Sequence, residues 1–194
     1  MTASGGSDAA LPRPAGWTSA RPLPEPRQSR VASARSRKRT ILDLDVEAPA
    51  DPTVADALRD DLAAVARVAA SRLALPDVLH VAVVDDAAMI DVHRRSHGDA
   101  TVTDVVTYEL ERNPEGRVVE GDVIVCLGEA RRQAAAREHT MRLELLLYAL
   151  HGLLHLCGHD DLDEASYRAM HAAEDELLTA AGFGPAFAAG DDVP

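Results

Sequence analysis

Apolar and polar residues alternate in four short stretches of the chain, and a period of two residues is typical of half-buried β-strands. These stretches are also rich in valine, isoleucine and threonine, which favour an extended backbone. The pattern predicts strands at residues 40–46, 78–84, 101–108 and 121–126. An Asn-Pro-Glu-Gly turn signal at residues 113–116 separates the last two, so we expect them to pair as a hairpin.

Five other stretches place apolar residues every three or four positions, which is the period of an amphipathic helix. They cover residues 54–73, 85–97, 128–138, 141–156 and 163–181. Together the strands and helices predict an α+β fold, a single domain at residues 40–182 in which helices cover a mixed sheet of about four strands.

The end of the fourth predicted helix carries the most informative residues. Residues 143–150 are nearly all apolar, so this helix is expected to be buried and central. His151 and His155 follow, and side chains four residues apart lie on the same helix face. Both imidazoles can then reach one metal ion. Paired histidines can also be ordinary hydrogen-bonded core residues, but the glycine and the carboxylates that come next favour a metal site.

A third ligand is expected just after Gly158. If the helix continued, His159 would lie about 12 Å along the axis from His151, too far for a shared zinc ion. Glycine permits the left-handed turn that ends a helix. Among the candidates that follow, the spacing after the glycine favours Asp161, with His159 as the alternative. Two histidines and one aspartate leave a fourth position for water, as catalytic zinc requires.

One specific absence argues against a metallopeptidase. The helical peptidase motif has a glutamate directly after the first histidine, where it acts as general base. That position is Gly152 in this chain.

Charge is distributed unevenly over the 194 residues, whose net charge is −12. Residues 1–40 have a net charge of +6 and the remainder −18. Residues 1–39 are rich in proline, serine and arginine, and we predict a disordered basic tail there. Residues 183–194 are expected to form a loose C-terminal segment. The acidic body argues against a broad nucleic-acid surface, so an RNA substrate would need a local basic groove or the tail.

The two cysteines are too few for a disulfide framework, which favours a reducing compartment. The chain has no run of 18 apolar residues and no apolar stretch near its N-terminus typical of a secretory signal. We therefore expect a cytoplasmic protein without a membrane span.

Three motifs in a fixed order resemble those of the YbeY family of bacterial zinc-dependent endoribonucleases, also called rRNA maturation factors. The resemblance extends from about residue 41 to residue 178 and includes Met170 and Glu174. The motifs are Thr103-Asp104-Val-Val-Thr-Tyr108, Gly121-Asp122-Val-Ile-Val-Cys126 and His151-Gly-Leu-Leu-His155-Leu-Cys-Gly158.

The resemblance implies one Zn²⁺ ion and cleavage of single-stranded RNA. It further implies maturation of the 3′ end of small-subunit rRNA, contact with the small ribosomal subunit and a role in ribosome quality control. The chain departs from the family at the third ligand, where Asp161 replaces a histidine, and at His159, which replaces a tyrosine. The family's arginine before the Thr-Asp motif falls at His97, close to Arg94 and Arg95.

These positions give the candidate site. The metal ligands are His151, His155 and Asp161. A zinc-bound imidazole usually donates its other N–H to an acceptor such as a carboxylate, a role expected for Asp104 and Asp122, which lie near strand ends. The alternative for both is a strand-end turn or helix cap, and for Asp122 this alternative is favoured. The candidates for binding phosphate or protonating a leaving group are His97, Arg94 and Arg95.

Two other functions remain compatible with the sequence. One is a non-catalytic ribosome-assembly factor with a structural zinc, favoured by the acidic body and the missing arginine. The other is a metal-dependent hydrolase that acts on something other than RNA.

Overall fold

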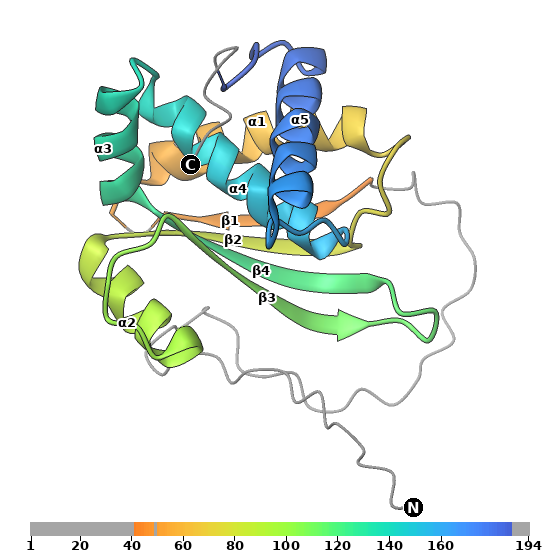
Figure 1. The fold of residues 1–194 in the computed structure, drawn as a ribbon, viewed down its shortest axis with the longest axis horizontal. Coiled ribbons are helices and arrows are strands. Elements are labelled where there is room, and N and C mark those ends of the chain that lie inside the picture. The colour runs from red at the N-terminus through yellow and green to blue at the C-terminus, as the bar shows by residue number, and fades with distance from the viewer. Residues whose placement is uncertain (1–40, 49, 188–194) are drawn as a thin grey trace, which may run out of the picture.

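A four-stranded mixed sheet forms the centre of the computed structural model, which describes residues 41–48 and 50–187. Figure 1 shows the strand order β1-β2-β4-β3. β1 and β2 are parallel, β2 and β4 are parallel, and β3 and β4 form an antiparallel hairpin. The mixed sheet and the hairpin confirm the fold class predicted from the sequence. The strands are β1 (Asp43–Glu47), β2 (Val78–Val84), β3 (Val105–Arg112) and β4 (Val118–Cys126).

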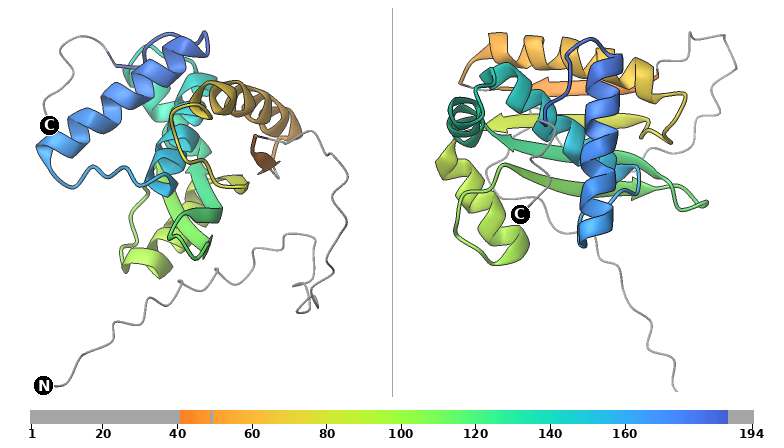
Figure 2. Two further views of the ribbon diagram at one scale, coloured as in Figure 1. Left: turned by 90° about the vertical axis from the view of Figure 1, so that its right-hand side faces the viewer. Right: turned by 45° about the horizontal axis from the view of Figure 1, so that its top comes forward.

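Helices cover the sheet unequally on its two faces. α1 and α4 pack on one face and α5 packs over them, whereas α2 lies on the other face (Figures 1 and 2). Two separate groups of buried apolar side chains correspond to these two faces. The helices are α1 (Pro52–Ala69), α2 (Asp86–His97), α3 (Leu127–Ala136), α4 (Met141–Leu156) and α5 (Glu164–Ala180).

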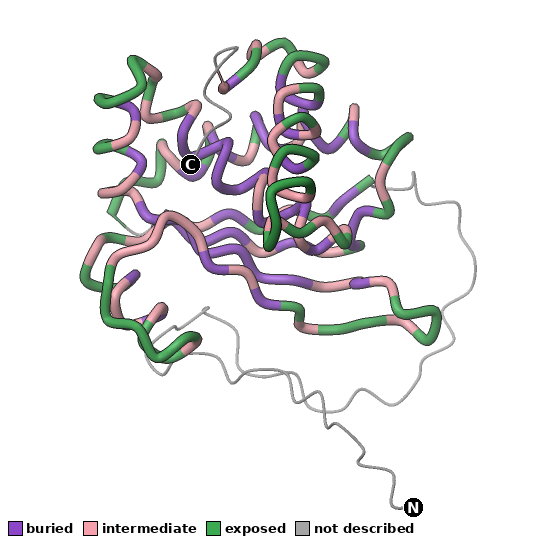
Figure 3. Tube along the Cα trace, viewed as in Figure 1, coloured by how far each residue is buried: buried purple, intermediate pink, exposed green. Residues whose placement is uncertain are grey.

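α4 is the central helix of the larger core. Nearly all of it is buried between the sheet and the other helices, as Figure 3 shows. Thr140 begins the helix by accepting a hydrogen bond from the backbone N–H of Leu143 at 3.1 Å. α5 begins with a reciprocal pair of hydrogen bonds between Asp163 and Ser166. These local contacts fix where the two helices that carry the site begin.

A close approach of α4 to the sheet depends on Gly152. A β-carbon at this position would lie 2.7 Å from Val123 Cγ1 and 2.8 Å from Thr107 Oγ1. Only glycine therefore allows α4 to lie this close to β3 and β4. This position faces the sheet, so a glutamate general base of the peptidase type has no room here.

The hairpin differs in detail from its prediction. β3 starts at Val105 and not at residue 101, and it extends to Arg112. Upstream, Asp99 accepts a hydrogen bond from the N–H of Thr101 at 3.0 Å, and Asp104 accepts one from the N–H of Val105 at 2.8 Å. Such side-chain contacts satisfy backbone donors locally and compete with strand pairing.

Part of the expected loose C-terminal segment is packed in the structure. Ala186 is buried, and its N–H donates to Asp175 Oδ1 at 2.7 Å. Phe187 also packs against the larger core. The predicted disordered tail at residues 1–39 and the last seven residues lie outside the described part of the chain.

Candidate metal centre

His151 and His155 lie one turn apart near the end of α4, where both side chains are partly buried. Their Nε2 atoms are 3.0 Å apart, and the two rings meet edge to face with centroids 4.6 Å apart. Both Nε2 atoms therefore face the same small space, as the four-residue spacing predicts.

The chain returns to this space through a left-handed turn at Gly158, whose φ is 94°. The N–H of Gly158 donates to the carbonyl of His155 at 2.9 Å, and the N–H of His159 donates to that of Leu154 at 3.1 Å. This pair of bonds is the Schellman arrangement that ends many helices. The turn predicted at this glycine is confirmed, and it brings Asp161 back to the histidines.

The carboxylate of Asp161 completes a three-residue group. Its Oδ2 lies 3.6 Å from His151 Nε2 and its Oδ1 lies 3.8 Å from His155 Nε2. One ligand atom from each residue lies within 4.8 Å of the others, and the described residues contain no second group of this kind. Ligands bound at about 2.0–2.2 Å in a tetrahedron are roughly 3.3 Å apart. The donor set therefore fits one small divalent ion.

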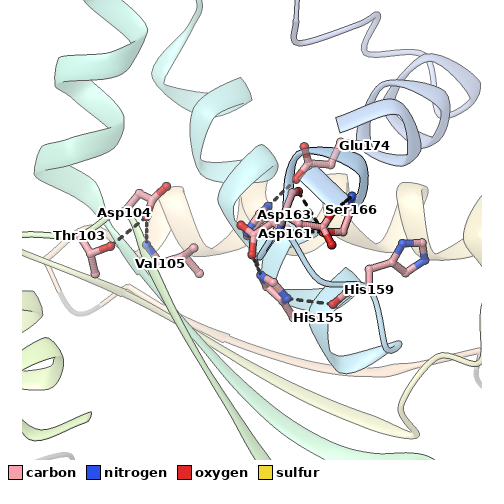
Figure 4. A network of polar contacts seen from close by, with 10 residues as sticks. Thr103, Asp104, Val105, His155, His159, Asp161, Asp163, Ser166 and Glu174 are labelled. Carbon is pink, nitrogen blue, oxygen red and sulfur yellow. Dashed lines mark hydrogen bonds and ion pairs between the residues drawn. The ribbon is translucent and has the colours of Figure 1, made fainter. Parts of the chain in front are cut away.

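Both histidines are held in the tautomer that a metal requires. Glu174 Oε1 of α5 accepts a hydrogen bond from His151 Nδ1 at 2.7 Å, and the carbonyl of His159 accepts one from His155 Nδ1 at 3.0 Å (Figure 4). Each ring donates through Nδ1, so its Nε2 has a lone pair that could bind a metal ion.

Burial and negative charge act in opposite directions on His151. Burial favours the neutral ring and would lower its pKa, but the hydrogen bond and charge of Glu174, with the charge of Asp161, outweigh burial and raise the pKa. The carboxylates thus create a strongly negative setting, which a bound cation would neutralise.

His159 contributes its backbone to the centre. Its carbonyl faces His155, while Figure 4 shows the imidazole pointing away. The group of three potential ligands contains Asp161 and not His159.

The structure does not place Asp104 and Asp122 where they would orient the two histidine rings, the role expected of them. Asp104 lines the cleft beside His151, but its carboxylate accepts from Thr103 Oγ1 at 3.1 Å and from Val105 N–H. Val123 faces α4, and side chains alternate along a strand, so Asp122 points to the opposite face of the sheet. The acceptors for the two ligand rings are Glu174 and the His159 carbonyl.

The three basic candidates lie in the last turn of α2, on the sheet face opposite α4. Arg94 and Arg95 both form ion pairs with Asp91. His97 is exposed, with its ring 5.3 Å from that of His93. None of these candidates lines the cleft at the metal centre.

A cleft of about 450 Å³, lined in part by His151 and Asp161, opens between α3, α4 and α5. Arg137, at the end of α3, is the one arginine or lysine of the described residues that lines it. The carboxylates of Asp104, Glu129, Asp161 and Glu174 also line it. Sequence reasoning gave no signal for Arg137, because nothing in its spacing links it to the histidine motif.

Fold and donor set together define a class of protein: an α+β domain in which two histidines of a buried helix and an aspartate from the segment after it face one space beside a cleft. Three protein ligands with an open position are typical of catalytic metal centres, whereas structural zinc sites are closed by four.

Comparison with known proteins identifies the family within this class. The family model described as Endoribonuclease YbeY matches residues 47–182. The chain therefore belongs to the YbeY endoribonuclease family, as its motifs predict.

Curated relatives agree with this assignment. An Endoribonuclease YbeY from Thermobifida fusca is 37% identical over 107 residues, which cover 52% of this chain and 69% of the relative. One from Acidothermus cellulolyticus is 34% identical over 113 residues, covering 53% and 69%. A solution structure of a Thermotoga maritima protein aligns with a TM-score of 0.47 at 20% identity, covering 71% of this chain and 89% of that one.

Proposed function

We propose that this chain is a zinc-dependent endoribonuclease that cleaves single-stranded RNA during ribosomal RNA maturation. The observation that carries the proposal is the convergence of His151, His155 and Asp161 on one space beside an open cleft. Membership of the YbeY family supports RNA as the substrate. The proposal includes the 3′ end of small-subunit rRNA as the target, the small ribosomal subunit as a partner and ribosome quality control as the setting.

Zinc fits the donor set, because imidazole and carboxylate are both accepted zinc ligands. When bound, Zn²⁺ would supply Lewis acidity toward a phosphoryl oxygen and lower the pKa of a water molecule. Asp161 would add a negative charge to the ligand set where the family usually has a neutral histidine, so the site with its ion would have less net positive charge.

The protein's own groups prepare the centre for this chemistry. Glu174 and the His159 carbonyl hold the Nδ1 protons of the two ligand histidines, which fixes both rings before any ion binds. The side of the metal centre without a protein ligand would face the cleft, where a strand of RNA can approach. Arg94, Arg95 and His97 remain proposed contacts to RNA, now outside the cleft and away from the cleaved bond.

No helix among the described residues is long and apolar enough to cross a membrane. Cys126 and Cys157 are both free thiols. Unpaired cysteines fit a reducing compartment, and we place the activity in the cytoplasm.

The direct test is cleavage of a single-stranded rRNA fragment by purified protein, with metal content measured on each sample. His151→Ala should lose both the bound metal and the cleavage. His159→Ala is the matched control, because it removes a neighbouring imidazole and keeps the carbonyl that holds His155. Bound metal without cleavage, also when ribosomal subunits are present, would contradict the nuclease and favour the non-catalytic assembly factor.

A further inference from the structure

The buried polar atoms without a hydrogen-bond partner are concentrated at the metal cleft. Within residues 41–48 and 50–187 there are four such atoms: Glu144 Oε2, Tyr148 OH, His171 Nδ1 and Glu174 Oε2. Tyr148, His171 and Glu174 line the cleft. Glu144 does not line it, but its Oε2 lies 3.9 Å from Nη1 of Arg137, which does. Buried polar groups are normally satisfied, so three exceptions in one cleft indicate a ligand or ordered water.

Two helices present these groups in line with the metal centre. On α4, Tyr148 precedes His151 by three residues, so both lie on one face. On α5, Tyr167, His171 and Glu174 follow the same spacing of four and three residues. The compartment beyond the metal ligands is therefore a continuation of the same cleft.

Aromatic rings gather in this compartment. The sequence has only one Trp, three Tyr and two Phe, yet Tyr148, Tyr167 and Phe187 all line this cleft. The His171 ring stacks on Phe187 with centroids 4.0 Å apart and an interplanar angle of 9°, and it lies 4.0 Å from the Tyr167 ring. We call Tyr167, His171 and Phe187 the aromatic cluster.

Arg137 lies next to the aromatic cluster. Its guanidinium carbon is 5.9 Å from the centre of the Phe187 ring, within the range of a cation–π contact. The side chain is 44% exposed, and its ion pair with Glu144 is too long for a hydrogen bond. The residue lines the cleft, where a ligand could accept hydrogen bonds from its guanidinium.

Tyr148 adds a second donor. Burial and the nearby carboxylates of Glu144, Asp104 and Glu129 raise its pKa, so the hydroxyl keeps its proton. A cation, a hydroxyl donor and stacked rings in one compartment match the parts of a nucleotide: a phosphate, sugar oxygens and a base.

We propose that Arg137, Tyr148 and the aromatic cluster form a nucleotide subsite for the RNA residue next to the cleaved bond. This inference rests on the proposed nuclease function and adds the location and chemistry of substrate binding. Arg137 binds the phosphate, Tyr148 donates to a phosphate or ribose oxygen, and the base stacks on the aromatic cluster. A single-stranded residue fits, because its base is free to leave the helical stack.

The test is equilibrium binding of a short single-stranded RNA by the full-length, metal-loaded protein, measured by fluorescence anisotropy at several salt concentrations. The RNA carries 2′-O-methyl groups and phosphorothioate linkages against cleavage, and a gel run afterwards checks that it is intact. Arg137→Met should reduce the slope of log affinity against log salt by about 0.7, the contribution of one phosphate contact to single strands. Arg131→Met is the matched control, since Arg131 is exposed on the same helix outside the cleft.

Substitutions in the aromatic cluster should give a different signature. Phe187→Ala should lower the affinity roughly tenfold, as for other base–aromatic stacks, without changing the salt slope. Phe187→Tyr should restore the affinity, because it returns a ring to the same place. A variant that had lost its structure would not lower the affinity while keeping the salt dependence of binding unchanged. Thermal melting of each variant checks that it is folded.

Several outcomes overturn the subsite. They are the absence of RNA binding by the wild type, an Arg137→Met slope equal to that of Arg131→Met, and an unchanged affinity in Phe187→Ala. The failure of the nuclease proposal looks different: the wild type would bind RNA through Arg137 and Phe187 and leave a cleavable strand intact. If the protein cleaves RNA but its RNA affinity does not depend on Arg137 or Phe187, the nuclease proposal stands and the subsite is rejected.

Discussion

Glu174 Oε1 lies 2.7 Å from His151 Nδ1, joining the middle of the last helix to the first of the three potential metal ligands across 23 residues of sequence. The carboxylate is 1% exposed, and its second oxygen has no hydrogen-bond partner among the described residues. Its position is explained by the ring it holds, because a buried carboxylate is unfavourable without such a partner.

Glu174→Gln should therefore weaken metal binding about 10- to 100-fold, because the amide can still accept the hydrogen bond but no longer raises the basicity of the ring. Competition with a chromophoric chelator measures the affinity. Glu176→Gln is the matched control: it is on the same helix, and its ion pair with Arg72 is largely exposed. Equal metal affinities of Glu174→Gln and Glu176→Gln would show that Glu174 does not support metal binding.

The third ligand can be assigned by two neighbouring substitutions. Asp161→Ala should remove most of the bound metal, whereas His159→Ala should retain it, since the His159 ring points away and only its carbonyl contacts His155. Metal content after dialysis decides between them. The reverse pattern would make His159 the ligand.

Gly152→Ala should destabilise the fold by about 1–3 kcal/mol, because the added methyl group meets Val123 and Thr107 in a packed interface. The sign of the change in the free energy of unfolding is informative, because on an exposed helix the same substitution stabilises by roughly 0.5–1 kcal/mol through helix propensity. Urea unfolding followed by circular dichroism gives the free energy of unfolding, and a stabilised variant would contradict the close approach of α4 to the sheet.

The two cysteines should react slowly in the native protein. Burial raises the pKa of Cys126 and of Cys157 to about 11, so both remain thiols at pH 8. Iodoacetamide at pH 8 should modify them far faster in denaturant than in buffer, as followed by mass spectrometry. Because the folded pKa values exceed the unfolded value, the folded state binds these protons more tightly. Their contribution to stability is complete below the ordinary thiol pKa of 9.0 and is lost as pH rises toward 11.

Single substitutions of Arg94, Arg95 and His97 should lower RNA cleavage mainly by raising KM, with kcat nearly unchanged, because these residues lie outside the cleft. The expected change is up to roughly fivefold for an exposed contact. Steady-state cleavage kinetics separate the two constants. If none of the three substitutions has an effect, these residues of α2 have no part in binding RNA. A large fall in kcat for any one of them would instead place that residue at the reacting phosphate.

The sequence by itself determined the local features of this protein. The helical repeat places His151 and His155 on one face, and Gly158 permits the left-handed turn that returns Asp161 to them. The alternation of apolar residues gave all four strands, although side-chain contacts of Asp99 and Asp104 delay the start of β3. Each of these properties depends on residues only a few positions apart, which is why a pattern in the chain is sufficient to predict it.

Only the tertiary structure decided which distant residues share the site. The docking of α5 on α4 brings Glu174 to His151, while the sheet alternation turns Asp122 to the opposite face. The position of α2 on that face separates Arg94, Arg95 and His97 from the cleft, and the end of α3 supplies Arg137. These relationships depend on strand order and on how closely helices pack against the sheet. Packing acts between segments far apart in the chain, so the spacing of residues carries no signal for it.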